Sequence, residues 1–128
     1  MQTAITRGVR VSVETFYQGE YSNPLSGEYM FAYRITITNQ SEHMLQLLRR
    51  HWHIIDSVGV EKEVEGEGVI GEQPVLRPGQ TYQYISGCNL NTEIGKMYGT
   101  YLMMKVNDGK KFRVNIPEFI LVATQKLN

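Results

Sequence analysis

The sequence predicts an all-β fold, an antiparallel β-sandwich of about seven short strands. Seven separate runs have the pattern of strands, and in most of them apolar and polar residues alternate, which is typical of strands that have one face in a core and the other in solvent. Turn-forming clusters of Asn, Pro, Asp and Gly separate the runs at hairpin-like intervals. No amphipathic helix is predicted between them. Short strands without helices favour a sandwich of two packed sheets.

The runs differ in how clearly they predict a strand. Residues 9–13 alternate valine with polar residues, and every odd-numbered residue from Tyr29 to Ile37 is large and apolar. Residues 97–106 are apolar on both faces, which indicates a central strand. The other runs are 45–56, 60–67, 82–84 and 111–116. We expect one domain over residues 1–128, with an ordered core over about 6–123 and a loose tail at 125–128.

The hairpin between runs 45–56 and 60–67 can be predicted in register. Asp56 begins and Gly59 ends a four-residue segment with the preferences of a type I turn, so Gly59 is expected to be left-handed and Asp56 to pair with Val60. The cross-strand pairs are then His53 with Glu63, His51 with Glu65, Arg49 with Glu67, and Trp52 with Val64. A slip of one residue would set glutamates beside the buried Trp52, so turn and pairing chemistry favour the same register.

Two aromatic residues favour an immunoglobulin-like sandwich of the fibronectin type III-like kind. Trp52 falls in the third predicted strand, where such folds bury a Trp. Tyr101 falls in the sixth, at a position that resembles a tyrosine corner in a disulfide-free variant. We expect Trp52 to pack between the sheets against Tyr33, Ile35 and Phe112.

Composition narrows the possible functions. The 13 basic and 13 acidic residues balance, so no global field attracts nucleic acid or anionic lipid. The single cysteine, Cys88, precludes an internal disulfide and fits a cytoplasmic location, which we expect. No stretch approaches the roughly 20 apolar residues of a membrane span. Cys88 has no activating neighbour in the sequence, and Ser86-Gly87 lacks the context of a nucleophile elbow, so we expect neither residue to act as a nucleophile.

Residues 66–71 read GEGVIG, a literal GxGxxG. Such a loop can hold a pyrophosphate or nucleotide where a helix follows it. Here Pro74 follows, no helical pattern begins, and glutamates surround the loop. We therefore favour a loop whose glycines need positive φ, with phosphate binding at Gly66, Gly68 and Gly71 as the alternative.

The residues around Trp52 suggest two further roles. His51 and His53 share one face of a strand, and with Glu63 or Glu65 they could bind a divalent metal such as Mg²⁺ or Co²⁺ weakly. A solvated ladder of His–Glu pairs is the favoured interpretation. Arg50 shares the buried face with Trp52, so we expect a structural anchor paired with a carboxylate or several carbonyls.

Nearly the whole chain resembles the ApaG family. The motifs that carry the resemblance are 31–37 (FAYRITI), 50–52 (RHW), 63–74 (EVEGEGVIGEQP), 76–79 (LRPG), 84–87 (YISG), 90–92 (LNT), 95–101 (GKMYGTY) and 116–119 (IPEF). Two departures are Glu93, where the family usually has Pro, and Arg49, where it often has Ser.

This resemblance implies a fibronectin type III-like fold, no catalytic residues, and an association with cobalt tolerance and magnesium efflux. Eukaryotic members are fused to F-box and DNA-polymerase-interacting proteins, which implies protein binding. We therefore expect a protein-interaction domain that uses an exposed strand edge or the glycine-rich loop. The alternative is a binder of pyrophosphate, nucleotide or a divalent cation, through loop 66–71 or the His/Glu face.

Overall fold

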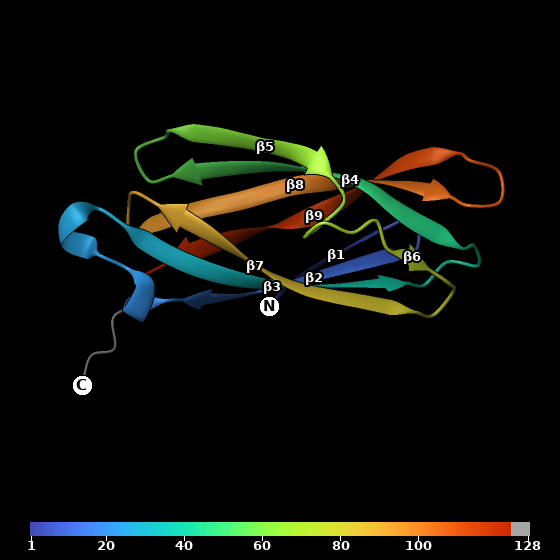
Figure 1. The fold of residues 1–128 in the computed structure, drawn as a ribbon, viewed down its shortest axis with the longest axis horizontal. Coiled ribbons are helices and arrows are strands. Elements are labelled where there is room, and N and C mark those ends of the chain that lie inside the picture. Colours follow the sequence, from blue (N-terminus) through green and yellow to red (C-terminus); the bar gives the residue numbers. More distant parts are fainter. Residues whose placement is uncertain (124–128) are drawn as a thin grey trace.

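Two antiparallel sheets form the protein in a computed structural model that describes residues 1–123 (Figure 1). The all-β sandwich is therefore confirmed, and the tail expected at 125–128 lies outside the described residues. The strands are β1 (Gln2–Thr6), β2 (Val9–Tyr17), β3 (Tyr29–Asn39), β4 (Leu45–Asp56), β5 (Glu61–Glu67), β6 (Val75–Leu76), β7 (Thr81–Leu90), β8 (Ile94–Lys105) and β9 (Lys111–Val122). Single 3-10 turns at Gly19–Tyr21 (η1) and Pro24–Ser26 (η2) link β2 to β3. No helix in the described part has the length and apolarity to cross a membrane.

The strand order is β1-β2-β3-β7 in one sheet and β5-β4-β8-β9 in the other, with β6 paired to the start of β4. The sequence predicted seven of these strands and missed β1 and the two-residue β6. Since β1 pairs with β2 from Gln2 onward, regular structure begins earlier than the expected boundary near residue 6.

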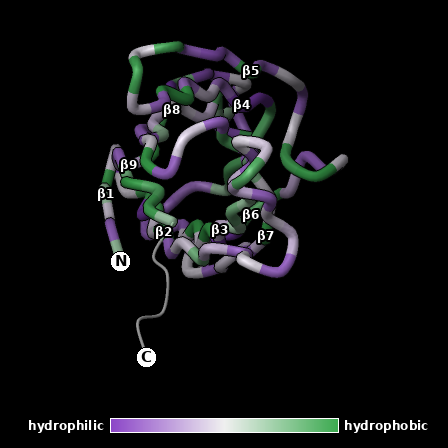
Figure 2. Tube along the Cα trace, turned by 90° about the vertical axis from the view of Figure 1, so that its left-hand side faces the viewer, coloured by the Kyte–Doolittle hydropathy of each residue, from purple (hydrophilic) through white to green (hydrophobic). Residues whose placement is uncertain are grey.

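The two sides of the sandwich differ. On one side β1 lies beside β9, where the Asn115 N–H donates to Thr6 Oγ1 at 3.1 Å (Figure 2). On the other side β5 and β7 are edge strands of different sheets, and the segment between β5 and β6 passes across the space between them (Figure 2). In the described fold the edge strands β1 and β9 therefore pack against each other, which we call the closed side, whereas the edges of β5 and β7 lie apart.

An aromatic cluster occupies the centre of the core. The Trp52 ring meets Tyr33 at a centroid distance of 5.5 Å and Phe119 at 5.8 Å, both edge-on. Tyr33 and Phe119 also contact each other, at 5.8 Å. Phe112, expected in this cluster, is only partly buried and pairs across to Met103. Phe119 takes the expected place because the β8–β9 register shifts between Met97 and Gly99, which changes the inward-facing parity of β9.

The predicted β4–β5 register is confirmed. His53 pairs with Glu63, His51 with Glu65, Arg49 with Glu67, and Trp52 with Val64. At the turn, the Asp56 N–H donates to the Val60 carbonyl at 3.1 Å, and Gly59 has a φ of 87°. The Asp56 carboxylate also accepts from the Val58 and Val60 N–H groups, at 3.0 and 2.9 Å. Since the register sets side-chain parity, Trp52 lies inward and both histidines lie on the outer face.

Candidate functional site

A cleft of about 260 Å³ opens between the sheets on the side of β5 and β7. The residues that line it are Tyr33, Arg50, Trp52, Ile54, Val64, Val69, Ile70, Tyr84, Ser86, Gly87 and Met97. The aromatic floor comes from Tyr33, Trp52 and Tyr84, which are buried. The rim includes Val64 and Ile70, which are 38% and 57% exposed. The cleft is therefore a recess of mixed lining, with Arg50 and Ser86 beside the aromatic and aliphatic side chains, and it reaches the aromatic core from the surface.

The glycine-rich segment forms a tight hairpin at the end of this cleft. The N–H groups of Val69 and Glu72 donate to each other's carbonyls, at 2.8 and 2.9 Å. The two central residues, Ile70 and Gly71, have φ values of 42° and 80°, as a type I′ turn requires. A β-branched residue at positive φ is a conformational outlier, with a cost of about 1–2 kcal/mol. Ile70 is thus an apolar side chain held in a strained backbone at the rim of the cleft.

Arg50 anchors this hairpin to β4. Its Nη1 donates to the carbonyls of Glu67 and Gly68, at 3.0 Å each. These are carbonyl partners of the kind expected for an Arg on the core face. A Cβ on Gly66 would lie 2.9 Å from Arg50 Nη1, so the absent side chain allows the guanidinium to approach the backbone.

Each of the three glycines in the GxGxxG motif is therefore required for a different structural reason. Gly66 makes room for Arg50, and Gly71 supplies positive φ in the turn. Gly68 combines a φ of 61° with a position where a Cβ would overlap the Glu72 carbonyl oxygen. The Gly68 N–H donates to the Leu48 carbonyl at 2.8 Å, and no helix follows the loop among the described residues. This geometry differs from a phosphate-cradling loop, in which free N–H groups converge at a helix N-terminus.

A buried tyrosine pair lies behind the cleft. The hydroxyls of Tyr84, on β7, and Tyr101, on β8, are 2.5 Å apart and join the two sheets. Burial raises the pKa of both phenols above the usual range, so both are protonated at neutral pH. Tyr101 therefore differs from the expected tyrosine corner, whose hydroxyl bonds nearby backbone. Sequence reasoning missed Tyr84, although two inward-facing tyrosines signal buried hydroxyls that need partners.

The edge strand β7 forms one wall of the cleft and has an unusual composition. Its ten residues, Thr81–Leu90, include no charged residue and no proline. Exposed edges normally carry such residues, because unpaired N–H and C=O groups recruit other strands. The other edge, β5, has five charged side chains among seven residues. Ile85 of β7 is 59% exposed, and the Tyr82 hydroxyl donates to Glu72 at 3.0 Å where the hairpin reaches β7.

The predicted metal-ligating residues gather on the opposite face of β4. The ligand atoms of His51, His53 and Glu63 lie within 4.8 Å of one another. A carboxylate oxygen of Glu65 lies 3.4 Å from His51 Nε2. These side chains do not line the cleft, because Trp52 between them points inward.

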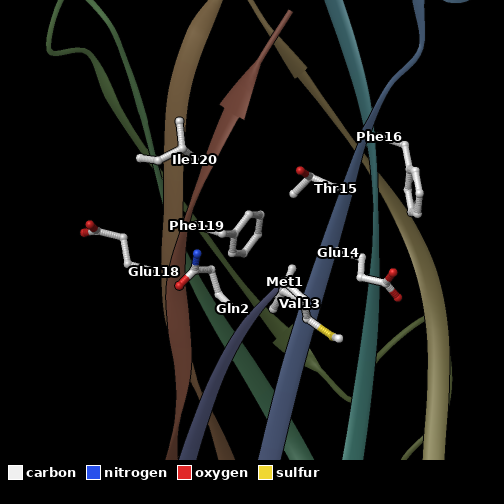
Figure 3. A pocket seen from close by; sticks show the side chains of 9 residues that line it. All are labelled: Met1, Gln2, Val13, Glu14, Thr15, Phe16, Glu118, Phe119 and Ile120. Carbon is white, nitrogen blue, oxygen red and sulfur yellow. The ribbon is translucent and has the colours of Figure 1, made fainter. Parts of the chain in front are cut away.

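A larger hollow, of about 530 Å³, lies at the closed side between β2 and the end of β9 (Figure 3). The Phe119 ring projects into it, while Glu118 and Phe16 lie on opposite sides (Figure 3). Glu14, on its wall, pairs with Arg34 at 3.3 Å. Its charged groups do not converge, so it has less of the character of a binding site than the smaller cleft.

Both the sequence and the fold of this chain match those of a known protein family. Residues 19–105 match the family described as the ApaG domain. Curated relatives named Protein ApaG, from Brucella canis and Sinorhizobium fredii, are each 50% identical over 121 residues, covering 94% of this chain and 92% of theirs. A crystal structure of a protein from Bordetella pertussis is 45% identical with a TM-score of 0.88, over 92% of this chain and 95% of that one.

Proposed function

The chain belongs to the ApaG family, and from that premise we propose that it is a non-enzymatic protein-interaction domain. In this proposal an extended segment of a partner protein adds to the free edge of β7. One of the partner's apolar side chains enters the neighbouring cleft. The partner segment that fits this surface is an uncharged strand with an apolar anchor residue.

The uncharged edge of β7 is the observation that carries the proposal. Backbone N–H and C=O groups along that edge have no strand partner among the described residues. Strand addition satisfies such groups through main-chain hydrogen bonds, and adjacent pockets for side chains give specificity. The edge strand β5 is highly charged, and β9 has three charged residues and a proline. The uncharged edge strand β1 packs against β9, so β7 is the edge best suited to accept another strand.

The cleft supports the same mode of binding. Burial of one Leu or Phe side chain against its aromatic floor would contribute about 1.5–3 kcal/mol. Ile70 and Val64, exposed at the rim, would be covered by the bound segment. The strain at Ile70 is compatible with a recognition role, since strained backbone is concentrated at functional positions.

The titratable groups near the cleft favour binding over catalysis. Burial raises the pKa of the Cys88 thiol to about 11, so the nucleophilic thiolate is scarce at neutral pH. Burial likewise raises the pKa of Tyr33, which remains a neutral phenol. On this proposal, the association with cobalt tolerance and magnesium efflux that the family resemblance implies would act through a bound protein in the cytoplasm.

Selection of peptides from a random display library tests the proposal. Enriched peptides should share an apolar residue within an uncharged segment, and their affinity is measured by fluorescence anisotropy. Val64→Asp puts a charge on the cleft rim and should weaken binding about tenfold or more, a loss of about 1.4 kcal/mol. Val58→Asp makes the same change in the exposed β4–β5 turn, away from the cleft, and should have no effect. Equal affinity of Val64→Asp and wild type, or no enrichment, would overturn the proposal.

A further inference from the structure

We propose that His51, His53 and Glu63 form a binding site for a divalent transition metal of the Zn²⁺ class, with Glu65 as an adjacent carboxylate. The site lies on the outer face of the β4–β5 hairpin. It is separate from the cleft, because these residues have the opposite strand parity to Trp52. The inference is therefore independent of the peptide-binding proposal.

The distances between the ligand atoms approach those of a metal site. Glu63 Oε1 lies 3.4 Å from His53 Nδ1 and 3.7 Å from His51 Nε2. Tetrahedral Zn²⁺, with bonds of about 2.0–2.1 Å, holds its ligand atoms about 3.3 Å apart. The three ligand atoms lie within 4.8 Å of one another, so side-chain rotations that bring the two imidazole nitrogens closer would complete the set. Three protein ligands leave a fourth position for water or Glu65.

Aromatic stacking defines the ring plane of His53. The His53 ring stacks on His51 at a centroid distance of 4.6 Å and on Tyr98 of β8 at 4.8 Å. The interplanar angle with Tyr98 is only 9°, so His53 has a defined ring plane. Both histidines are partly buried, which limits their alternative rotamers. Because an imidazole lone pair lies in the ring plane, His51 must turn relative to His53 for both nitrogens to face one ion, while the stack on Tyr98 holds His53.

The His51 Nε2 atom gives an independent indication of a ligand at this face. It is withdrawn from solvent and has no hydrogen-bond partner among residues 1–123. Its nearest carboxylate oxygen, on Glu65, lies at 3.4 Å without hydrogen-bond geometry. Buried polar atoms are nearly always paired, and a bound cation would satisfy this nitrogen. His53 Nδ1 now contacts Glu61 at 3.0 Å and would exchange that contact for the metal.

The donor set selects the class of metal. Two imidazole nitrogens and one carboxylate oxygen suit Zn²⁺ and similar transition metals. Mg²⁺ prefers oxygen ligands and retains several waters. The weak Mg²⁺ binding considered from the sequence is thus less suited to this cluster than a transition metal.

Calorimetric titration of the untagged protein with ZnCl₂ tests the site. Wild type should bind one Zn²⁺ per chain, and its thermal stability should increase on addition of the metal. His53→Ala and Glu63→Gln should each lose affinity about tenfold or more, since even outer partners of metal ligands account for about 10–100-fold. His43→Ala removes the remaining histidine, exposed before β4 and outside the cluster, and should bind as wild type does.

Two further measurements check that the variants fold and identify the atoms that bind the metal. Circular dichroism of the metal-free variants establishes that they fold, as expected for outward-facing positions. Imidazole ¹⁵N shifts should report Zn²⁺ on His51 Nε2 and His53 Nδ1, and a tenfold excess of MgCl₂ should not displace it. No saturable Zn²⁺ binding, equal binding by folded His53→Ala, or a loss of binding in His43→Ala would overturn the proposal.

Discussion

Substitution of Gly68 by alanine separates the two interpretations of the GxGxxG motif. If the glycine is required for conformation, Gly68→Ala lowers the free energy of unfolding, and no phosphate compound restores it. If it is required for recognition, the variant folds normally and loses a ligand. Gly71→Ala is the matched control, because Gly71 has the same left-handed backbone but no atom within 4 Å of the position that a Cβ would take.

The structure sets the size of the difference. Both substitutions place alanine at positive φ, 61° for Gly68 and 80° for Gly71, which costs about 1 kcal/mol. The Cβ of Gly68→Ala would also displace the Glu72 carbonyl that accepts the Val69 N–H. Loss of that hydrogen bond in a buried segment costs about 1–2 kcal/mol more. We expect Gly68→Ala to lower the free energy of unfolding by about 2–3 kcal/mol and Gly71→Ala by about 1 kcal/mol.

Urea unfolding followed by tryptophan fluorescence measures both values, since Trp52 is buried in the core. The larger change corresponds to a Tm roughly 10 °C lower for a chain of this size. Titration of wild type with ATP, GTP and pyrophosphate at low salt should give no saturable signal. Equal stability of the two variants would refute the steric argument. Saturable nucleotide binding abolished by Gly68→Ala without loss of stability would favour the phosphate alternative.

Four further predictions concern the core, the hairpin and the thiol. Trp52→Ala should lower the free energy of unfolding by about 3–5 kcal/mol in urea, and the partly buried Phe112→Ala by clearly less; equal losses would contradict the core described here. Ile70→Gly should raise the Tm by relieving about 1 kcal/mol of strain while weakening peptide binding in the anisotropy assay, and a lowered Tm would contradict the strain. Arg50→Met should lower the free energy of unfolding by about 1–3 kcal/mol and speed amide exchange in residues 67–72, whereas unchanged exchange would show that Arg50 is no anchor. Burial raises the pKa of Cys88 from 9.0 to about 11. The protonated thiol therefore stabilises the fold fully below pH 9, and this stabilisation is lost as the pH rises to about 11. Urea unfolding midpoints across that range should fall less steeply in Cys88→Ala than in wild type, and equal slopes would contradict the raised pKa.

The sequence predicted local features well because they depend on neighbouring residues. Turn preferences at Asp56 and Gly59, combined with strand alternation, were enough to specify the β4–β5 register. That register in turn places His51, His53 and Glu63 together on the outer face. The metal-ligand cluster can therefore be predicted from the sequence. The stacking of Tyr98 on His53 cannot, because Tyr98 comes from β8, a strand outside the β4–β5 hairpin.

Features that depend on packing between the sheets were missed. Phe119 was missed because the bulge in the β8–β9 pairing reverses side-chain parity near Pro117, which simple alternation does not reveal. Phe112 has the inward parity expected of it but is only partly buried near the start of β9. The Tyr84–Tyr101 pair joins strands of different sheets. The cleft likewise depends on the separation of two non-adjacent edges, so no local pattern predicts its lining residues.

Amide hydrogen exchange along β7, with and without a selected peptide, is the most direct test of the proposed binding mode. Strand addition predicts that N–H groups on the free edge of residues 83–90 exchange about tenfold or more slowly in the complex, since each becomes hydrogen-bonded. The N–H groups of β1 and β9, on the closed side, should exchange at unchanged rates. Protection confined to β1 and β9, or tight binding without protection of β7, would contradict it.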